Sequence, residues 1–196
     1  NTRIIFDCNK RLYIKQDYFF NIIGNFSYFF KEIRISQLKQ KTNLPVVIFP
    51  GDPSQISPQA DAILFLSLIS GRNPELLIGQ HVVAAPILKN TRLEVIPTGY
   101  MLINSGKITS VAYISNTMPI PDDKYSLAAS TALAGQMLGL QTIYIDAGSG
   151  AEKEISARMI AAGSPTQSVT TRATVPMVSI PCATTLGRPT SAASCR

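Results

Sequence analysis

The sequence predicts an α/β fold in which a parallel sheet is covered by helices, as in a β/α barrel. Short apolar runs that do not alternate with polar residues occur at 46–49, 62–66 and 142–145, and helical patterns separate them. Such runs are typical of parallel strands buried on both faces. Polar and glycine-rich residues follow these strands, where a β/α barrel builds its active site. A doubly wound sheet stays open as an alternative, although no Gly-x-Gly-x-x-Gly opens the first helix.

Length and composition favour a globular domain with a sizeable core. The chain has 196 residues, of which 45% are hydrophobic, and no apolar run is long enough to cross a membrane. No secretory signal is visible, and three cysteines and one histidine show no metal or disulfide spacing, so we expect a cytoplasmic setting. The net charge of +6 is concentrated in residues 1–43 and 163–196. The mildly acidic centre carries no basic and aromatic alternation, which argues against nucleic-acid binding.

The first half of the chain contains three expected strands and two expected helices. We expect strands at 4–6, ending at Asp7, and at 46–49 and 62–66, with a helix over 31–41. A cap, a proline and an acid at 73–75 start a second helix, which carries His81. A solvated or core position for His81 is favoured over a catalytic one.

The second half continues the pattern and then loses it. We expect strands at 93–96, closing at 97–100, at 108–115, and at 142–145, with a polar loop at 116–121 and a helix over 154–162. We expect a helix that begins at Asp122 and ends at Gly139. Its core-facing side should consist of Leu127, Thr131, Ala134 and Leu138, which are spaced three and four residues apart. Residues 163–196 contain no aromatic and no acidic residue, so we expect an irregular tail with one strand over 175–180.

The strongest candidate site follows the strand at 142–145. Asp146 comes directly after this strand, and Gly148, Ser149 and Gly150 come next. Glycines around a serine let backbone N–H groups approach an anion closely, because no Cβ intervenes. A carboxylate beside an anion cradle suggests a phosphorylated alcohol, with the carboxylate facing its hydroxyl. An ordinary strand-to-helix turn remains an open alternative.

The central residues resemble the geranylgeranylglyceryl/heptaprenylglyceryl phosphate synthase family, prenyltransferases on a modified TIM (β/α)8 barrel. The matching stretches include NLPVVIFPGDPSQIS at 43–57, ADAILFLSLISGRNPE at 60–75, EVIPTGYMLI at 94–103 and IYIDAGSGA at 143–151. The resemblance covers roughly residues 43–162 and is closest to bacterial members. It implies transfer of a polyprenyl group from its diphosphate to the C3 hydroxyl of sn-glycerol-1-phosphate.

The resemblance also implies roles for individual residues. Asp146 matches the acidic residue that takes the proton from the C3 hydroxyl. The wall of the polyprenyl site falls on Thr98, Gly99 and Tyr100, and Asp7 is the candidate Mg²⁺ ligand. The glycerol-1-phosphate site falls on Tyr144, Ile145, Asp146, Ala147, Gly148, Ser149 and Gly150.

Both ends of the chain depart from the family pattern. No Gly-Gly-Ser follows Asp17, and the family's glycine-rich and Gly-Asn phosphate loops do not occur after Ala162. We therefore expect an incomplete barrel domain over 1–162, best matched over 43–162, and a poorly structured tail over 163–196. An out-of-frame reading would produce such a tail, and an intact reading frame through that segment of the gene would reject this hypothesis.

The expected partners follow from the same resemblance. They are sn-glycerol-1-phosphate, a polyprenyl diphosphate with Mg²⁺, further copies of the chain in a homo-oligomer, and a membrane surface met through the lipid substrate. Two alternatives to an active prenyltransferase stay open. One is an inactive, truncated member of the family, and the other is another phosphate-binding β/α-barrel enzyme.

Overall fold

The computed structural model describes residues 2–6, 12–16, 35–41, 43–148, 151–164 and 177–179. For the segments 2–6, 12–16 and 177–179 it describes the backbone alone. All structural statements below concern these residues.

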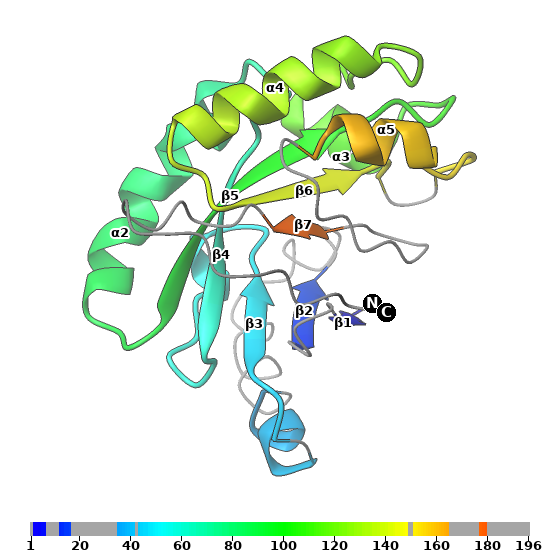
Figure 1. Cartoon of the computed structure of the whole chain (residues 1–196). Coiled ribbons are helices and arrows are strands. Elements are labelled where there is room, and N and C mark those ends of the chain that lie inside the picture. The colour runs from blue at the N-terminus through cyan, green and yellow to red at the C-terminus, as the bar shows by residue number, and fades with distance from the viewer. Residues whose placement is uncertain are drawn as a thin grey trace, which may run out of the picture.

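Seven strands form one sheet, and their order in the sheet is their order along the chain. Strands β2 to β6 run parallel to one another, whereas β1 is antiparallel to β2 and β7 is antiparallel to β6. Figure 1 shows that the sheet curls, with helices on its outer side. The predicted α/β fold is therefore confirmed as a curled, incomplete barrel. The strands are β1 (Thr2–Phe6), β2 (Leu12–Gln16), β3 (Val46–Phe49), β4 (Ala62–Ser67), β5 (Glu94–Leu102), β6 (Thr142–Asp146) and β7 (Met177–Ser179).

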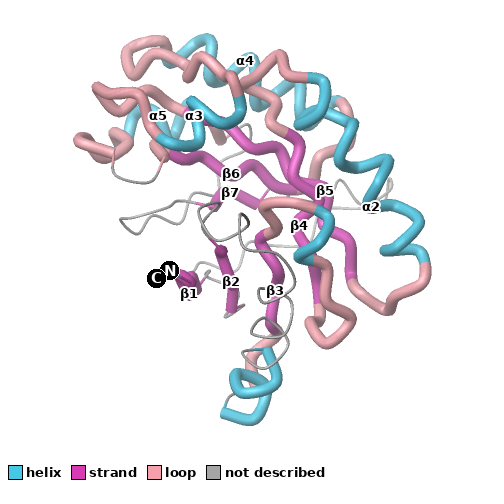
Figure 2. Tube along the Cα trace, turned by 180° about the vertical axis from the view of Figure 1, so that it is seen from behind, coloured by secondary structure: helices cyan, strands magenta, loops and turns pink. Residues whose placement is uncertain are grey.

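Helices follow most of the central strands, and Figure 2 shows several of them along one side of the sheet. A helical stretch at 35–41 precedes β3. The further helices are η2 (Pro53–Gln55), η3 (Glu75–Gly79), α2 (Gln80–Lys89), α3 (Ser110–Ser115), α4 (Tyr125–Met137) and α5 (Ala157–Ala162). Of these, η2 is a 3-10 helix of three residues that follows β3, and the π-helix η3 leads directly into α2.

The two faces of the sheet pack differently because successive side chains of a strand point to opposite faces. On the outer face, β3 and β4 pack against the 35–41 helix and α2, and β5 and β6 pack against α4 and α5. The inner face carries a separate cluster that α3 covers at one end. Its members include Val47, Phe49, Leu64, Ile96, Tyr100, Leu102, Ala112 and Tyr144.

The strand predicted over 108–115 is wrong, because Ser110–Ser115 form the helix α3 there. Thr109 begins α3, because its hydroxyl accepts a hydrogen bond from the backbone N–H of Ala112 at 3.4 Å. Asn116 ends the helix in a left-handed conformation with φ of 49°. A short run of mixed apolar residues is ambiguous between helix and strand, and the capping residues decide it here.

The predicted core stripe of α4 is also wrong, although its end at Gly139 is confirmed. Leu127 and Leu138 are 48% and 80% exposed, and the buried side of α4 carries Ala128, Ala132 and Gly135 instead. A Cβ on Gly135 would lie 3.0 Å from the Ile69 side chain. Small residues therefore let α4 lie close to the sheet. The helix also starts later than predicted, at Tyr125 rather than Asp122.

Strand β5 is longer than predicted. It runs through Pro97, Thr98, Gly99 and Tyr100, which were expected to close the strand. Parallel partners hold these turn-forming residues extended, since Pro97 pairs with Phe65 of β4 and its carbonyl accepts from Gln141 N–H at 2.8 Å. The strands expected at 4–6 and 175–180 are confirmed as β1 and β7. Within the described residues, no helix is both long and apolar enough to span a bilayer.

Candidate functional site

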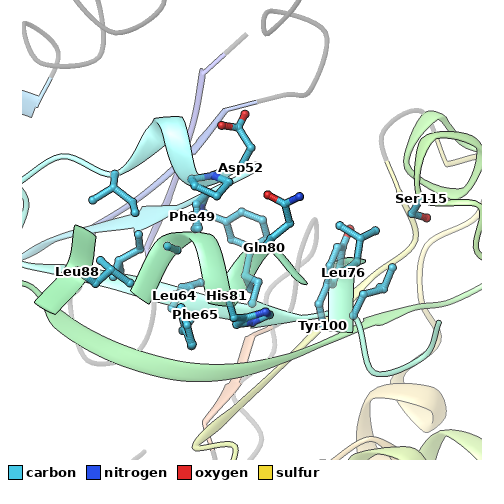
Figure 3. A pocket seen from close by; sticks show the side chains of 18 of the residues that line it. Phe49, Asp52, Leu64, Phe65, Leu76, Gln80, His81, Leu88, Tyr100 and Ser115 are labelled. Atoms are coloured by element: carbon cyan, nitrogen blue, oxygen red, sulfur yellow. The ribbon is translucent and has the colours of Figure 1, made fainter. Parts of the chain in front are cut away.

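An apolar cleft opens where β3 and β4 separate. These strands pair only through Val47 with Ala62 and Ile48 with Ile63, and the three-residue η2 follows β3 in place of a longer helix. Side chains from both strands, η2, α2, β5 and α3 line the space that remains, and Figure 3 shows the cleft extending from Leu88 to Ser115. Its empty space, including open solvent at the mouth, is about 730 Å³. An elongated apolar ligand fits such a surface.

Most of the cleft wall is aliphatic or aromatic, and His81 and Ser115 are buried polar side chains within it. His81 is 8% exposed and packs edge-on against the Phe65 ring, with the ring centroids 4.3 Å apart. Burial lowers the pKa of His81, and hydrogen bonds to the backbone of Leu66 and Phe65 only partly offset this. The imidazole is therefore neutral near pH 7. Its Nδ1 atom has no hydrogen-bond partner among the described residues.

One end of the cleft meets the predicted acid. The Tyr100 ring lines the cleft, and its hydroxyl donates to Asp146 Oδ2 at 2.7 Å. The other carboxylate oxygen of Asp146 accepts from Gly148 N–H at 2.9 Å. Asp146 is 6% exposed, so this is a buried carboxylate with a hydrogen bond on each oxygen. Hydrogen bonds to the charged form favour an ionised carboxylate, whereas burial opposes it.

Three aromatic rings meet beside this hydrogen bond. Phe49 packs edge-on against Tyr144 and Tyr100, with ring centroids 4.7 Å and 6.2 Å apart. Tyr100 and Tyr144 are 5.4 Å apart and lie opposite each other in the β5–β6 register. The rings come from three strands of the inner face, which explains why they converge on one point. They hold the Tyr100 ring between the cleft and Asp146.

The turn after β6 requires glycine at its first bend. Gly148 has φ of +85°, a region that L side chains rarely adopt. A Cβ on Gly148 would also lie 2.5 Å from Thr109 Oγ1, because the start of α3 packs against this turn. The turn is therefore held in place from the β5 side, and its N–H at Gly148 is directed to Asp146.

The predicted phosphate-site residues fall into four groups. Tyr144 and Asp146 lie on the inner face, beside the cleft end. Ile145 is fully buried on the outer face against α4 and α5, so its side chain points away from that end. Ala147 continues the chain into the turn at Gly148. Ser149 and Gly150 lie outside the described residues, as does Asp7.

The predicted prenyl wall is represented in the cleft by Tyr100. Thr98 is fully buried on the inner face, and its hydroxyl donates to the carbonyl of Ile96 at 2.9 Å. Gly99 faces the outer side, where a Cβ would lie 2.7 Å from Cδ1 of Ile69. Of these three residues, the structure brings Tyr100 together with Asp146.

Sequence reasoning missed the part of the cleft that η3 and α2 supply. Leu76 of η3 and His81, Ala84 and Leu88 of α2 line it, and the sequence singles out only His81, as a solvated or core residue. One signal could have found this surface. The connection between β3 and β4 has 12 residues and four prolines or glycines within 50–58, so it has little room for a covering helix.

The residues described here do not make a metal site by themselves. No group of three or more His, Cys, Asp or Glu side chains lies together among them. The Asp146 oxygens accept hydrogen bonds from Tyr100 and Gly148.

Comparison with known proteins gives consistent matches. A geranylgeranylglyceryl phosphate synthase of Spirosoma linguale is 59% identical over 135 residues, which are 69% of this chain and 54% of that relative. The protein of the same name from Flavobacterium johnsoniae is 65% identical over 126 residues, 64% of this chain and 52% of its own length. The chain thus spans about half the length of the curated relatives it matches.

A solved structure agrees with these matches. The (S)-3-O-geranylgeranylglyceryl phosphate synthase of Thermoplasma acidophilum, crystallised with its substrate sn-glycerol-1-phosphate, superposes with a TM-score of 0.60 at 38% identity. The superposition covers 66% of this chain and 51% of that one. The sequence pattern of the PcrB family matches residues 28–171, which include the cleft, Tyr100 and Asp146. With this match and the curved sheet that carries the cleft, the chain belongs to the PcrB family.

Proposed function

We propose that this protein is a prenyltransferase that joins a polyprenyl diphosphate to the C3 hydroxyl of sn-glycerol-1-phosphate and releases diphosphate. The observation that carries the proposal is the buried carboxylate of Asp146, which Tyr100 links to one end of an apolar cleft. The relatives' names and the glycerol-1-phosphate bound to the Thermoplasma enzyme support the same reaction.

The cleft suits the hydrocarbon tail of the donor. Burial of an isoprenoid chain against leucine, phenylalanine and alanine side chains is favourable by about 25 cal/mol per Å² of apolar surface. Asp52 and Gln80 lie along the wall as its more exposed polar members. We propose that the tail runs from the Tyr100 end towards Leu88 (Figure 3), which leaves the diphosphate-bearing carbon near Tyr100 and its hydrogen-bond partner Asp146.

The reaction then needs a nucleophile and a proton acceptor at that end. The allylic C–O bond breaks, and its electron pair leaves with the diphosphate. The C3 oxygen of glycerol-1-phosphate forms the new ether bond, and its proton passes to the Asp146 carboxylate. A general base contributes most when it is held within hydrogen-bond reach of the hydroxyl it deprotonates.

We propose that the turn after β6 binds the phosphate of glycerol-1-phosphate through residues 144–150. The left-handed Gly148 supports this role, since it lets the backbone turn directly after the base. Ser149 and Gly150 remain candidates from the sequence. Ile145, whose side chain packs against the outer helices, could contribute through its backbone.

Mg²⁺ is a further part of the proposal, because the charge that develops on a leaving diphosphate needs neutralisation. The described residues do not fit a magnesium site by themselves. Its ligands would come from outside them, with Asp7 as the candidate, and removal of Mg²⁺ with a chelator tests the requirement.

Three features of the cellular setting are proposed with the activity. Homo-oligomerisation is supported by exposed apolar residues of η3 and α2, where Ile78, Val82 and Ile87 are 60%, 66% and 46% exposed. Contact with a membrane surface follows from the lipid donor. A cytoplasmic location follows from cysteine spacing that favours reduced thiols.

An assay with labelled sn-glycerol-1-phosphate and a ladder of prenyl diphosphates tests the function. Asp146→Asn should lower kcat by about 10²–10⁴-fold, because it removes the base. The control Asp123→Asn changes an exposed carboxylate and should leave the rate unchanged. An Asp146→Asn variant that keeps full activity would contradict the assigned role.

A thermal melt separates the alternatives. If the chain is an active prenyltransferase, sn-glycerol-1-phosphate should bind and raise its melting temperature. A flat response with no product would favour an inactive, truncated family member. Stabilisation by other phosphorylated alcohols alone would favour a different phosphate-binding barrel enzyme.

A further inference from the structure

The hydrogen bond between Tyr100 and Asp146 joins residues 46 positions apart. They lie on adjacent parallel strands, where Leu102 pairs with Asp146 and Tyr100 pairs with Tyr144. Tyr100 is therefore two residues before the position opposite Asp146, with its side chain on the same face. A diagonal neighbour of this kind is within reach of an aromatic side chain.

The position of the Tyr100 hydroxyl is well determined by its surroundings. Tyr100 is 7% exposed, and the rings of Phe49 and Tyr144 pack against its ring. A ring held on two sides cannot swing its hydroxyl away without displacing its neighbours. The hydroxyl is therefore directed to Asp146 Oδ2, while the other part of the ring contributes to the cleft wall.

Two donors to Asp146 differ in kind. Gly148 N–H belongs to the backbone of the turn, whose left-handed conformation at this position favours glycine. The Tyr100 hydroxyl is a side-chain donor, and its ring also forms part of the surface that would meet the prenyl tail. Tyr100 thus contacts both the acid and the donor site.

We infer that Tyr100 is a positioning residue that orients the Asp146 carboxylate towards the reaction centre and keeps it ionised. This inference rests on the proposed function, in which Asp146 receives the proton of the acceptor hydroxyl. A hydrogen bond to the charged form favours that form, so the base stays available at lower pH. The packed ring fixes the position of the hydroxyl, and the hydrogen bond in turn fixes the orientation of the carboxylate.

The first test needs no turnover. Carboxyl ¹³C NMR of the full chain, with the Asp146 signal assigned by its loss in Asp146→Asn, gives the titration midpoint of this residue. Tyr100→Phe keeps the ring and removes the hydroxyl, so the midpoint should rise by about one pH unit. Tyr113→Phe is the matched control, because Tyr113 is 80% exposed on α3, and it should leave the midpoint unchanged. An unchanged midpoint in Tyr100→Phe would overturn the inference.

The second test uses the prenyl-transfer assay. Tyr100→Phe should shift the acid limb of the pH profile of kcat upward by a similar amount, with an unchanged KM for the prenyl diphosphate, because the ring still lines the cleft. A uniform loss of kcat at every pH would contradict the inference and indicate a structural defect alone. If the wild-type chain neither forms product nor is stabilised by sn-glycerol-1-phosphate, the proposed function fails, and the NMR result still decides the Tyr100–Asp146 coupling.

Discussion

The two ends of the cleft are built from different parts of the fold. The Tyr100 end consists of neighbouring parallel strands, and its side chains are held by a register of backbone hydrogen bonds. The Leu88 end lies between α2, η2 and the separated parts of β3 and β4, where packing contacts take the place of a strand ladder.

This difference explains what each end can do. Proton transfer requires atoms placed within a few tenths of an ångström, and a strand register supplies such placement. A hydrocarbon chain requires only an apolar surface of adequate length, because the hydrophobic effect is not directional. The catalytic chemistry is therefore expected at the strand ends, and the selection of tail length is expected at the helix.

The largest stability effect is expected at the polar end, for Gly148→Ala. The left-handed backbone alone costs about 1–2 kcal/mol for alanine, and the new Cβ would clash with Thr109. Gly139→Ala is the matched control, since Gly139 has φ of +89° and open space around its Cβ position. Denaturant unfolding should give a loss for Gly148→Ala that exceeds the loss for Gly139→Ala by more than 1 kcal/mol. Equal losses would mean that the contact with Thr109 does not constrain the turn.

A change of specificity is expected at the apolar end, for Ala84→Phe. Ala84 is the smallest side chain that α2 places in the cleft, so a phenyl ring there would shorten the apolar surface. The kcat/KM for the longest accepted prenyl diphosphate should fall at least tenfold relative to a short one. The neighbouring Ala85→Phe change, on the exposed side of α2, should leave the length preference as it is. A parallel loss for all chain lengths would place the tail elsewhere.

The smallest effect is expected from the pH response of His81. Its pKa is lowered by burial, so over the interval between the lowered value and the ordinary 6.5 the unfolded chain binds more protons than the folded one. The stability is therefore fully present above pH 6.5 and declines as the pH falls through that interval. His81→Gln removes this dependence, and melts between about pH 7 and about pH 5 should show a smaller decline for the variant than for the wild type. Identical declines would show that His81 is not the buried base responsible.

Predictions from the sequence succeeded where local chemistry alone decides the structure. The run from Thr142 to Ile145 contains β-branched and aromatic residues and is buried throughout, as a central strand requires. Gly139 ends α4 in a left-handed conformation for the same local reason.

The predictions from the sequence failed where contacts with other elements decide the structure. Leu127 was expected to face the core because apolar residues usually do. In the structure, α4 instead directs its small residues, among them Gly135, towards the sheet near Gly99 of β5. The strand expected over 108–115 is a helix, since the Thr109 cap and the inner-face contacts of Ala112 favour α3.

The sequence by itself determined the parallel strands, the glycine turn after β6 and the acid at its start, because short-range sterics and apolar patterning act within a few residues. Only the tertiary structure decided that Tyr100 donates to Asp146 and that α2 and η2 line an apolar cleft beside them. Such contacts depend on strand register and helix packing, which bring together residues far apart in the chain.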